Sequence, residues 1–177
     1  MGLSPLVLLA TGWAGKLLLR QWWLTRSSPN TSHRHLLLST ASGVMLGVGF
    51  PDILPVPFLL WVAWIPLLVL AQEWLQTPDA RKRTLLFHVF NAALWWNIVA
   101  TYWVMNTSFA AGLFANIANS LLMCLPWLLF IFTARRLPHL KWAALVAFWL
   151  VFEYIHLNWE LTWPWLTLGN GWAEYPL

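Results

Sequence analysis

The chain has 177 residues, of which 60% are hydrophobic and only 9% charged, and it contains 16 tryptophans. Soluble domains carry about 25% charged residues, so this composition excludes an ordinary soluble domain and indicates an integral membrane protein. The net charge of +4 does not indicate nucleic-acid binding. The basic residues stand in short clusters between apolar runs, where they act as signals of membrane topology.

The first 35 residues carry the weakest pattern. The apolar run at 3–15 is short for a membrane span, and Lys16 and Arg20 follow it. No basic segment precedes the run, which argues against a signal peptide. We expect residues 1–35 to form an anchor or interfacial helix followed by a linker. The rest, residues 36–177, is expected to form an all-α bundle of about five transmembrane helices, or six if residues 3–15 insert.

The first expected span, residues 36–50, carries small residues at four-residue steps, namely Ser39, Gly43 and Gly47. Such a stripe lets two helix backbones approach closely. It could form a dimer seam between two copies or pack inside its own bundle, and we favour packing inside the bundle.

The second expected span covers residues 56–75 and contains Pro66. Proline removes one backbone hydrogen bond, so we expect a kink there. Trp61, Trp64 and Trp74 are interpreted as lipid-facing or interfacial aromatic residues.

The third and fourth expected spans cover residues 85–106 and 109–133, and each has a stripe of polar side chains. Because lone amides in hydrocarbon stay without hydrogen-bond partners, both stripes should face protein or water. His88 is interpreted as a hydrogen-bonded interior histidine rather than a ligand. The stripes are His88, Asn91, Trp95 and Tyr102 in the third span, and Asn116, Asn119 and Ser120 in the fourth.

The fifth expected span, residues 142–161, carries charge into an apolar helix. Glu153, His156 and Glu160 lie at i, i+3 and i+7, on one helical face. Glu153 lies about 18 Å along this helix, well inside a hydrocarbon core about 30 Å thick. A carboxylate at that depth must be paired, protonated or hydrated. We therefore expect Glu153 to pair with His156 or with the polar stripe of the third span.

The ten Lys and Arg residues precede the first span or follow the second and the fourth. Five spans place all of them on one side, which the positive-inside rule assigns to the cytoplasm. Residues from about 163 onward are then expected on the outer, periplasmic side.

These residues alone do not indicate a catalytic or metal site. Glu153 and His156 have the spacing of a di-iron helix motif, but such a site needs carboxylates from other helices, so we expect no metal and no cofactor. Cys124, the one cysteine, lies in an apolar run and has no charged neighbour that would make it a nucleophile.

Four segments resemble one family, apolipoprotein N-acyltransferase, in the form found in Bacteroidetes-like bacteria. They are GVMLGVGFPDILPVPFLLWVAWIPLL, NAALWWNIVATYWVMNTSFAAGLFANIANSLLM, AFWLVFEYIHLNWELTWPWLTLGNG and WAEYPL. The third is similar to the family's Glu-Trp-Leu-Arg, Phe-Pro-Trp and Leu-Gly-Tyr. Here His156 replaces the family's arginine and Asn170 its tyrosine.

The resemblance implies an enzyme of the bacterial inner membrane with eight transmembrane helices and a periplasmic nitrilase-like domain carrying Glu, Lys and Cys. It implies transfer of an acyl chain from a phospholipid to the N-terminal diacylglyceryl-cysteine of an apolipoprotein. The lipid bilayer, the phospholipid donor and the apolipoprotein acceptor are the implied partners. The chain has no counterpart of the triad, so we expect it to be the N-terminal membrane part and to be inactive alone.

The expected site residues are therefore supporting ones. Trp163, Pro164 and Trp165 are expected to shape a membrane-level floor beneath the catalytic domain, and Gly169, with Gly171, to allow a tight turn. Two alternatives stay open. The chain could be a small transporter or lipid-binding protein that uses Glu153 and His156, or a structural subunit that docks a separate nitrilase-like half.

Overall fold

The computed structural model describes residues 33–50, 56–77 and 80–173. Every regular element in these ranges is helical, which confirms the all-α fold. In chain order they are α2 (His33–Val48), η1 (Pro57–Leu59), α3 (Leu60–Ala63), α4 (Ile65–Gln76), α5 (Lys82–Ala100), η2 (Tyr102–Asn106), α6 (Phe109–Leu122), α7 (Cys124–Arg136), η3 (Pro138–Leu140), α8 (Lys141–Leu157), η4 (Pro164–Leu166) and η5 (Leu168–Trp172). Most of the expected N-terminal anchor, residues 1–32, lies outside the described residues.

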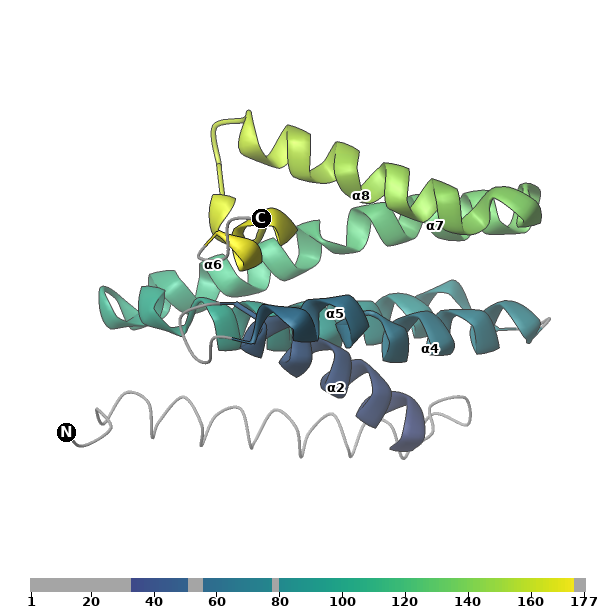
Figure 1. The fold of residues 1–177 in the computed structure, drawn as a ribbon, viewed down its shortest axis with the longest axis horizontal. Helices are drawn as coiled ribbons and strands as arrows, with labels where there is room; N and C mark the ends of the chain where they lie inside the picture. Colours follow the sequence, from purple (N-terminus) through teal and green to yellow (C-terminus); the bar gives the residue numbers. More distant parts are fainter. Residues whose placement is uncertain (1–32, 51–55, 78–79, 174–177) are drawn as a thin grey trace.

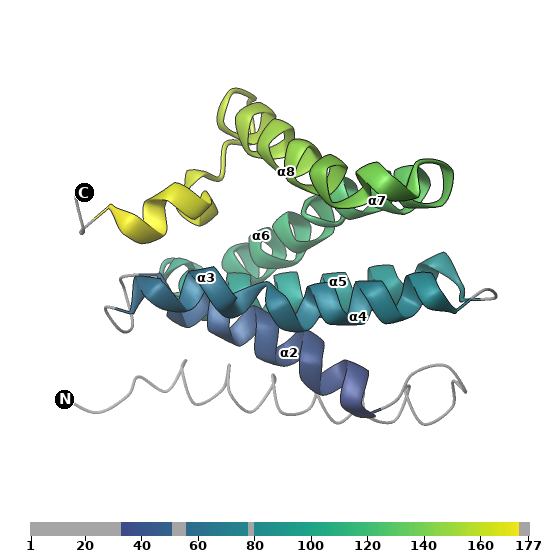
Figure 2. The same ribbon diagram turned by 45° about the vertical axis from the view of Figure 1, so that its right-hand side comes forward.

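Helices α2, α4 and α5 form one layer, and α6 with α7 crosses from this layer to α8 (Figures 1 and 2). α8 packs against α7, and η4 and η5 return from its end toward the layer. Among the described residues, three stretches are long and apolar enough to cross a membrane, at Pro57–Gln76, Phe109–Arg136 and Pro138–Leu157. The chain is thus an all-α membrane protein. The two further spans expected at 36–50 and 85–106 stay predictions.

Three of the expected spans are interrupted, and the break in the second span lies beside the kink expected at Pro66. The second span breaks at Trp64, between α3 and α4, and Pro66 stands in the first turn of α4. The expected span 109–133 is interrupted at Met123, directly before the first turn of α7, which contains Pro126. The expected span 85–106 leaves the α-helix after Ala100 and continues as η2. Proline lacks an N–H, which explains why the first two breaks stand where they do.

The small residues of α2 face α5, as expected for packing inside the bundle. A Cβ placed on Gly43 would overlap the carbonyl oxygen of Ala92, and one on Gly47 would lie 2.5 Å from the Cβ of Val99. The two backbones therefore approach as closely as glycine allows.

The polar stripes are buried, as expected, in His88, Asn91, Asn116, Asn119 and Ser120. The Oγ of Ser39 lies 3.3 Å from Nδ1 of His88, so His88 is a hydrogen-bonded interior histidine. Between α5 and α6, Nδ2 of Asn119 donates to Oδ1 of Asn97 at 2.8 Å.

Tyr102 does not follow the expected stripe, because it lies in η2 beyond the end of α5 and is 39% exposed. The helical spacing that aligned it with His88 stops at Ala100.

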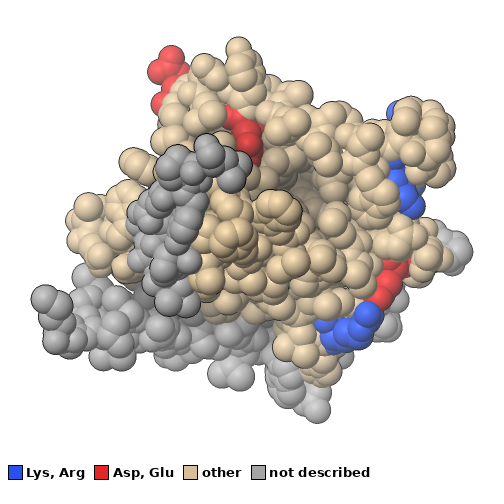
Figure 3. Space-filling model, in the orientation of Figure 1, with Lys and Arg blue, Asp and Glu red and all other residues tan. Residues whose placement is uncertain are grey.

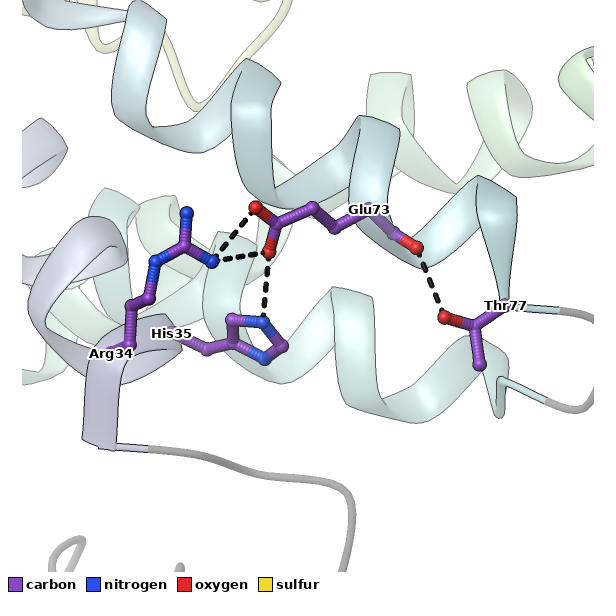
Figure 4. A network of polar contacts seen from close by, with 4 residues as sticks. All are labelled: Arg34, His35, Glu73 and Thr77. Carbon is purple, nitrogen blue, oxygen red and sulfur yellow. Dashed lines mark hydrogen bonds and ion pairs between the residues drawn. The ribbon is translucent and has the colours of Figure 1, made fainter.

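Among the described residues, lysine and arginine gather at one end of the molecule, whereas Glu residues also mark the opposite end (Figure 3). At the basic end, Arg34 of α2 forms a salt bridge with Glu73 of α4, with Nη1 2.7 Å from both carboxylate oxygens (Figure 4). Nε2 of His35 lies 3.1 Å from the same carboxylate, and Thr77 Oγ1 donates to the Glu73 carbonyl. This network joins α2 to the end of α4.

Candidate functional site

Four tryptophans from four elements meet in the middle of the molecule. They are Trp64 at the α3–α4 break, Trp96 of α5, Trp127 of α7 and Trp149 of α8. Ring centroids lie 4.8 Å apart for Trp64 and Trp149, and 5.9 Å apart for Trp96 and Trp149. Each such ring buries a large apolar area, so these contacts hold the outlying α8 against the rest of the bundle.

Of the interpretation of Trp64 and Trp74 as lipid-facing or interfacial, the lipid-facing part is therefore wrong. Trp64 belongs to the interior cluster, and Trp74 is 6% exposed with its Nε1 donating to the carbonyl of Arg81. Trp61 is 76% exposed, as expected for a lipid-facing residue. The break at Trp64 turns the two segments differently, so helical spacing from Trp61 does not place the later tryptophans.

Glu153 connects α8 to the segment that follows it. Its Oε1 accepts a hydrogen bond from Nε1 of Trp149 at 2.8 Å and one from the backbone N–H of Leu168 at 3.1 Å. Trp149 is four residues before Glu153, so both side chains share one face of α8. Two donors satisfy a carboxylate that would otherwise be costly at membrane depth.

The expected pairing of Glu153 with His156 or with the third span is wrong, since its carboxylate accepts hydrogen bonds from Trp149 and Leu168. His156 is 7% exposed and stacks on Phe152 with ring centroids 5.1 Å apart. Its Nε2 is buried without a hydrogen-bond partner in the structure. Stacking among aromatic rings, rather than the neighbouring carboxylate, determines its position.

The expected common face of Glu153, His156 and Glu160 is also wrong for Glu160. α8 ends at Leu157, four residues before the expected boundary at 161, and Glu160 is exposed beyond it. Asn158 terminates the helix, with its Nδ2 donating to the carbonyl of Tyr154 at 2.6 Å. Asparagine competes with the helix for backbone partners in this way.

Residues 163–172, which we call the closing segment, bridge α8 and the start of the second span. The ring of Trp172 lies 5.2 Å from that of Phe58 and 5.9 Å from that of Trp61. Trp165 is 48% exposed and meets Trp103 of η2 at 5.3 Å. The segment thus contacts three parts of the bundle that are far apart in sequence.

Side chains within the closing segment hold its shape. Pro164 offers its carbonyl to Nδ2 of Asn170 at 2.6 Å and to Oγ1 of Thr167 at 3.0 Å. Asn170, which stands where the resembling family has tyrosine, therefore has a structural bond of its own. Trp163 is half-buried against the hydrophobic core, and its Nε1 has no partner.

Gly169 and Gly171 lie in the tight backbone turns of η5, where the N–H of Asn170 bonds to the carbonyl of Thr167 at 2.9 Å and that of Ala173 to the carbonyl of Asn170 at 3.2 Å. Neither glycine has a positive φ, so the turns do not depend on the conformational freedom of glycine. A Cβ on Gly169 would meet nothing within 4 Å. A Cβ on Gly171 would collide with the side chain of Leu60, so glycine there serves close packing.

These groups can position and pack, and they offer no catalytic constellation. Among the described residues, no group of three or more His, Cys, Asp and Glu side chains could hold a metal ion. Cys124 is half-buried and its Sγ donates to the carbonyl of Ser120 at 3.4 Å. This thiol is hydrogen-bonded to its own helix backbone, and it has no neighbouring base of the kind that activates a nucleophile.

Sequence reasoning selected Glu153 and the closing segment but missed Trp149, Leu168 and Trp172. One signal was available for Trp149, whose four-residue spacing from Glu153 puts an indole N–H beside a carboxylate. No local pattern points to Leu168 or to the contact of Trp172 with Phe58.

Comparison with known proteins gives the family. Residues 42–177 match the family described as apolipoprotein N-acyltransferase N-terminal domain. A relative named apolipoprotein N-acyltransferase, from Chlorobaculum tepidum, is 29% identical over 141 residues, which are 77% of this chain and 25% of the relative. The chain thus spans about a quarter of the length of that relative. No solved structure matches.

Proposed function

The chain belongs to the apolipoprotein N-acyltransferase N-terminal domain family, and from this premise we propose that it forms the membrane part of such an enzyme. The complete enzyme transfers an acyl chain from a phospholipid to the N-terminal diacylglyceryl-cysteine of apolipoproteins, a step of lipoprotein maturation. The match over residues 42–177 and the all-α membrane fold support this function.

Within that enzyme, the chain holds and shapes the surface on which substrates are handled. The observation that carries this role is the hydrogen bond that the backbone N–H of Leu168 donates to Glu153, which fastens the closing segment to α8. The carboxylate is occupied by two donors, an arrangement that suits a fixed structural contact better than a proton carrier. This favours a scaffold over the alternative of a small transporter.

The protein resides in the bacterial inner membrane with its basic end in the cytoplasm. The gathering of Lys and Arg at one end supports this orientation through the positive-inside rule (Figure 3). The closing segment, near the other end, then lies on the periplasmic side, where Trp163, Pro164 and Trp165 form a floor for the acyl chains.

The acyl-transfer chemistry belongs to residues outside 1–177. The chain has one cysteine, Cys124, and its thiol is bonded to the helix backbone. A nucleophile of acyl transfer needs an adjacent base and an oxyanion site, which the surroundings of Cys124 do not offer.

The test is to express the complete reading frame that contains residues 1–177 in cells depleted of their own apolipoprotein N-acyltransferase. Mass spectrometry of a lipoprotein then reports the third acyl chain. We expect the wild type to restore it and Glu153→Ala to restore less, with Glu160→Ala as the matched control. A wild type that is present in the membrane yet leaves lipoproteins diacylated, while it drives pH-dependent solute uptake in proteoliposomes, would favour the transporter instead. Activity that appears only after co-purification with a separate nitrilase-like protein would favour the docking subunit.

A further inference from the structure

A polar cavity of about 450 Å³ lies at the basic end, where α4, α7 and α8 meet. Arg135 of α7 and Lys141 of α8 bring positive charge to its lining. Gln72 and Gln76 of α4, with Thr77 directly after the helix, add neutral hydrogen-bonding groups. Because these helices end here, the cavity stands at the depth of lipid headgroups rather than of acyl chains.

Both cations are held in place by neutral partners. Nζ of Lys141 donates to Oε1 of Gln72 at 3.0 Å. Arg135 donates to the carbonyl of Ala80 at 3.0 Å, and its guanidinium lies 4.8 Å from the ring centre of Trp74. The two side chains are thus ordered, and their positive charge is not cancelled by these contacts.

The carboxylate of Glu73, next to the cavity residue Gln72, does not neutralise these two cations. Glu73 stands next to Gln72 on α4, but both of its oxygens bond to Arg34 of α2 (Figure 4). The salt bridges among the described residues involve Glu73 with Arg34 and His35, and neither Arg135 nor Lys141 takes part in one. The described residues that line the cavity therefore present net positive charge to a ligand.

An apolar cavity of about 240 Å³ lies between the same two helices, α4 and α8. It is lined by Trp64, by Leu68 of α4, by Leu145, Val146, Trp149 and Leu150 of α8, and by Leu168 of the closing segment. In the space-filling view the surface is hollowed between α8 and the lower layer, with basic residues at one end of the hollow (Figure 3).

The two cavities follow one another along a single seam. Leu68 precedes Gln72 by one helical turn, and Leu145 follows Lys141 by one turn, so the polar and apolar linings adjoin on both helices. From Lys141 to Leu150 the seam runs about 14 Å, close to half of a hydrocarbon core that is about 30 Å thick. A charged end and an apolar length of one leaflet match the shape of a phospholipid.

We propose that the α4–α8 seam binds one anionic phospholipid, with its phosphate against Arg135 and Lys141 and one acyl chain along the apolar cavity. An anionic headgroup such as phosphatidylglycerol fits better than phosphatidylethanolamine, because Glu73 is occupied by Arg34 and offers no partner to an ammonium group. Basic pockets between transmembrane helices are known to hold anionic headgroups in this way. The headgroup end of the site lies away from the closing segment, whereas the apolar cavity reaches Leu168 of that segment. Lipid binding is measured without acyl transfer, so its outcome is separate from that of the proposed acyltransferase function.

The test is native mass spectrometry of the full chain in detergent, titrated with phosphatidylglycerol, phosphatidylethanolamine or glycerol phosphate. We expect one phosphatidylglycerol to bind, with phosphatidylethanolamine weaker and glycerol phosphate, which lacks acyl chains, not detected. Arg135→Gln and Lys141→Gln should each weaken phosphatidylglycerol binding about fivefold. Arg136→Gln, the adjacent exposed arginine outside the cavity lining, is the matched control and should change it less than twofold.

A second pair of variants tests the apolar part. Val146→Trp fills the cavity, whereas Val151→Trp adds the same bulk to α8 outside the lining; both valines are exposed, so neither change disturbs the core. We expect only Val146→Trp to displace the lipid. Three results would each overturn the proposal, since each indicates general attraction to the surface. The first is equal binding of both phospholipids. The others are a loss of binding with Arg136→Gln as large as with Arg135→Gln, and unchanged binding with Val146→Trp. Binding of glycerol phosphate as strong as that of the lipid would overturn it in favour of a free-phosphate site.

Discussion

Glu153 and Leu168 are 15 residues apart in sequence, and Oε1 of Glu153 accepts the backbone N–H of Leu168 at 3.1 Å. The same oxygen accepts the indole N–H of Trp149, whose ring belongs to the central tryptophan cluster. One carboxylate therefore connects the closing segment, α8 and the core.

Replacing Glu153 with alanine removes the shared acceptor and should lower the free energy of unfolding by about 1 kcal/mol or more. Glu153→Gln keeps a side-chain oxygen and should lose less. Thermal unfolding in detergent, followed by circular dichroism, measures both. Glu160→Ala is the control, since Glu160 is exposed beyond the end of α8 and its loss should stay within about 0.5 kcal/mol. Equal losses at the two positions would show that the Leu168 contact contributes nothing.

Gly43→Ala should destabilise the protein by about 1–3 kcal/mol, because the added methyl group overlaps the carbonyl of Ala92 and forces α2 and α5 apart. Gly169→Ala introduces the same methyl group where nothing lies within 4 Å. That control should be neutral or stabilise by about 0.4–1 kcal/mol, because alanine reduces the entropy of the unfolded chain. Unfolding of the two variants under identical detergent conditions gives the comparison. A tolerated Gly43→Ala would mean that the α2–α5 contact is looser than described.

Asn97 and Asn119 should be energetically coupled, since Nδ2 of Asn119 donates to Oδ1 of Asn97 at 2.8 Å between α5 and α6. A double-mutant cycle with alanine at each position should give a coupling of about 0.6 kcal/mol, the usual size between membrane helices. Asn97 and Ser39 belong to separate hydrogen-bond groups and provide the control cycle, whose coupling should be near zero. Additive losses at Asn97 and Asn119 would contradict the bond.

Trp165→Ala in the complete enzyme should impair the binding of substrate more than the stability of the fold. The indole is 48% exposed and its ring contact is with Trp103, so the change leaves the buried core intact. We expect a raised KM for the phospholipid or the lipopeptide at an unchanged unfolding temperature. Phe114→Ala, which removes another exposed aromatic residue on α6, should alter neither. Unchanged kinetics together with lower expression of Trp165→Ala would reject a role in substrate handling.

A polypeptide of residues 1–177 should not acylate a diacylated lipopeptide when it is supplied with phospholipid. Cys124 is its one thiol, and that thiol bonds to the carbonyl of Ser120 within its own helix. The mass of the lipopeptide after incubation measures the outcome, with Cys124→Ala as the control for background transfer. A mass increase that Cys124→Ala abolishes would overturn both the prediction and the assignment of catalysis to other residues.

The sequence by itself determined the class of the protein and the interior position of its polar stripes. Both follow from local free energies: apolar runs enter a membrane, and an amide such as Asn91 or Asn116 must leave the lipid to find a partner. The four-residue spacing of Ser39, Gly43 and Gly47 likewise indicated a close helix contact before any partner helix was known.

Only the tertiary structure decided which partners these residues have. Arg34 forms a salt bridge with Glu73, which is 39 residues away in sequence. Glu153 accepts a hydrogen bond from Leu168 rather than pairing with His156, and Trp64 packs in the interior at a helix break. Helical periodicity orders neighbours along one helix, but it holds only while that helix continues, and α8 ends before Glu160. Contacts between separate elements depend on how the helices cross, which is a property of the whole packed bundle.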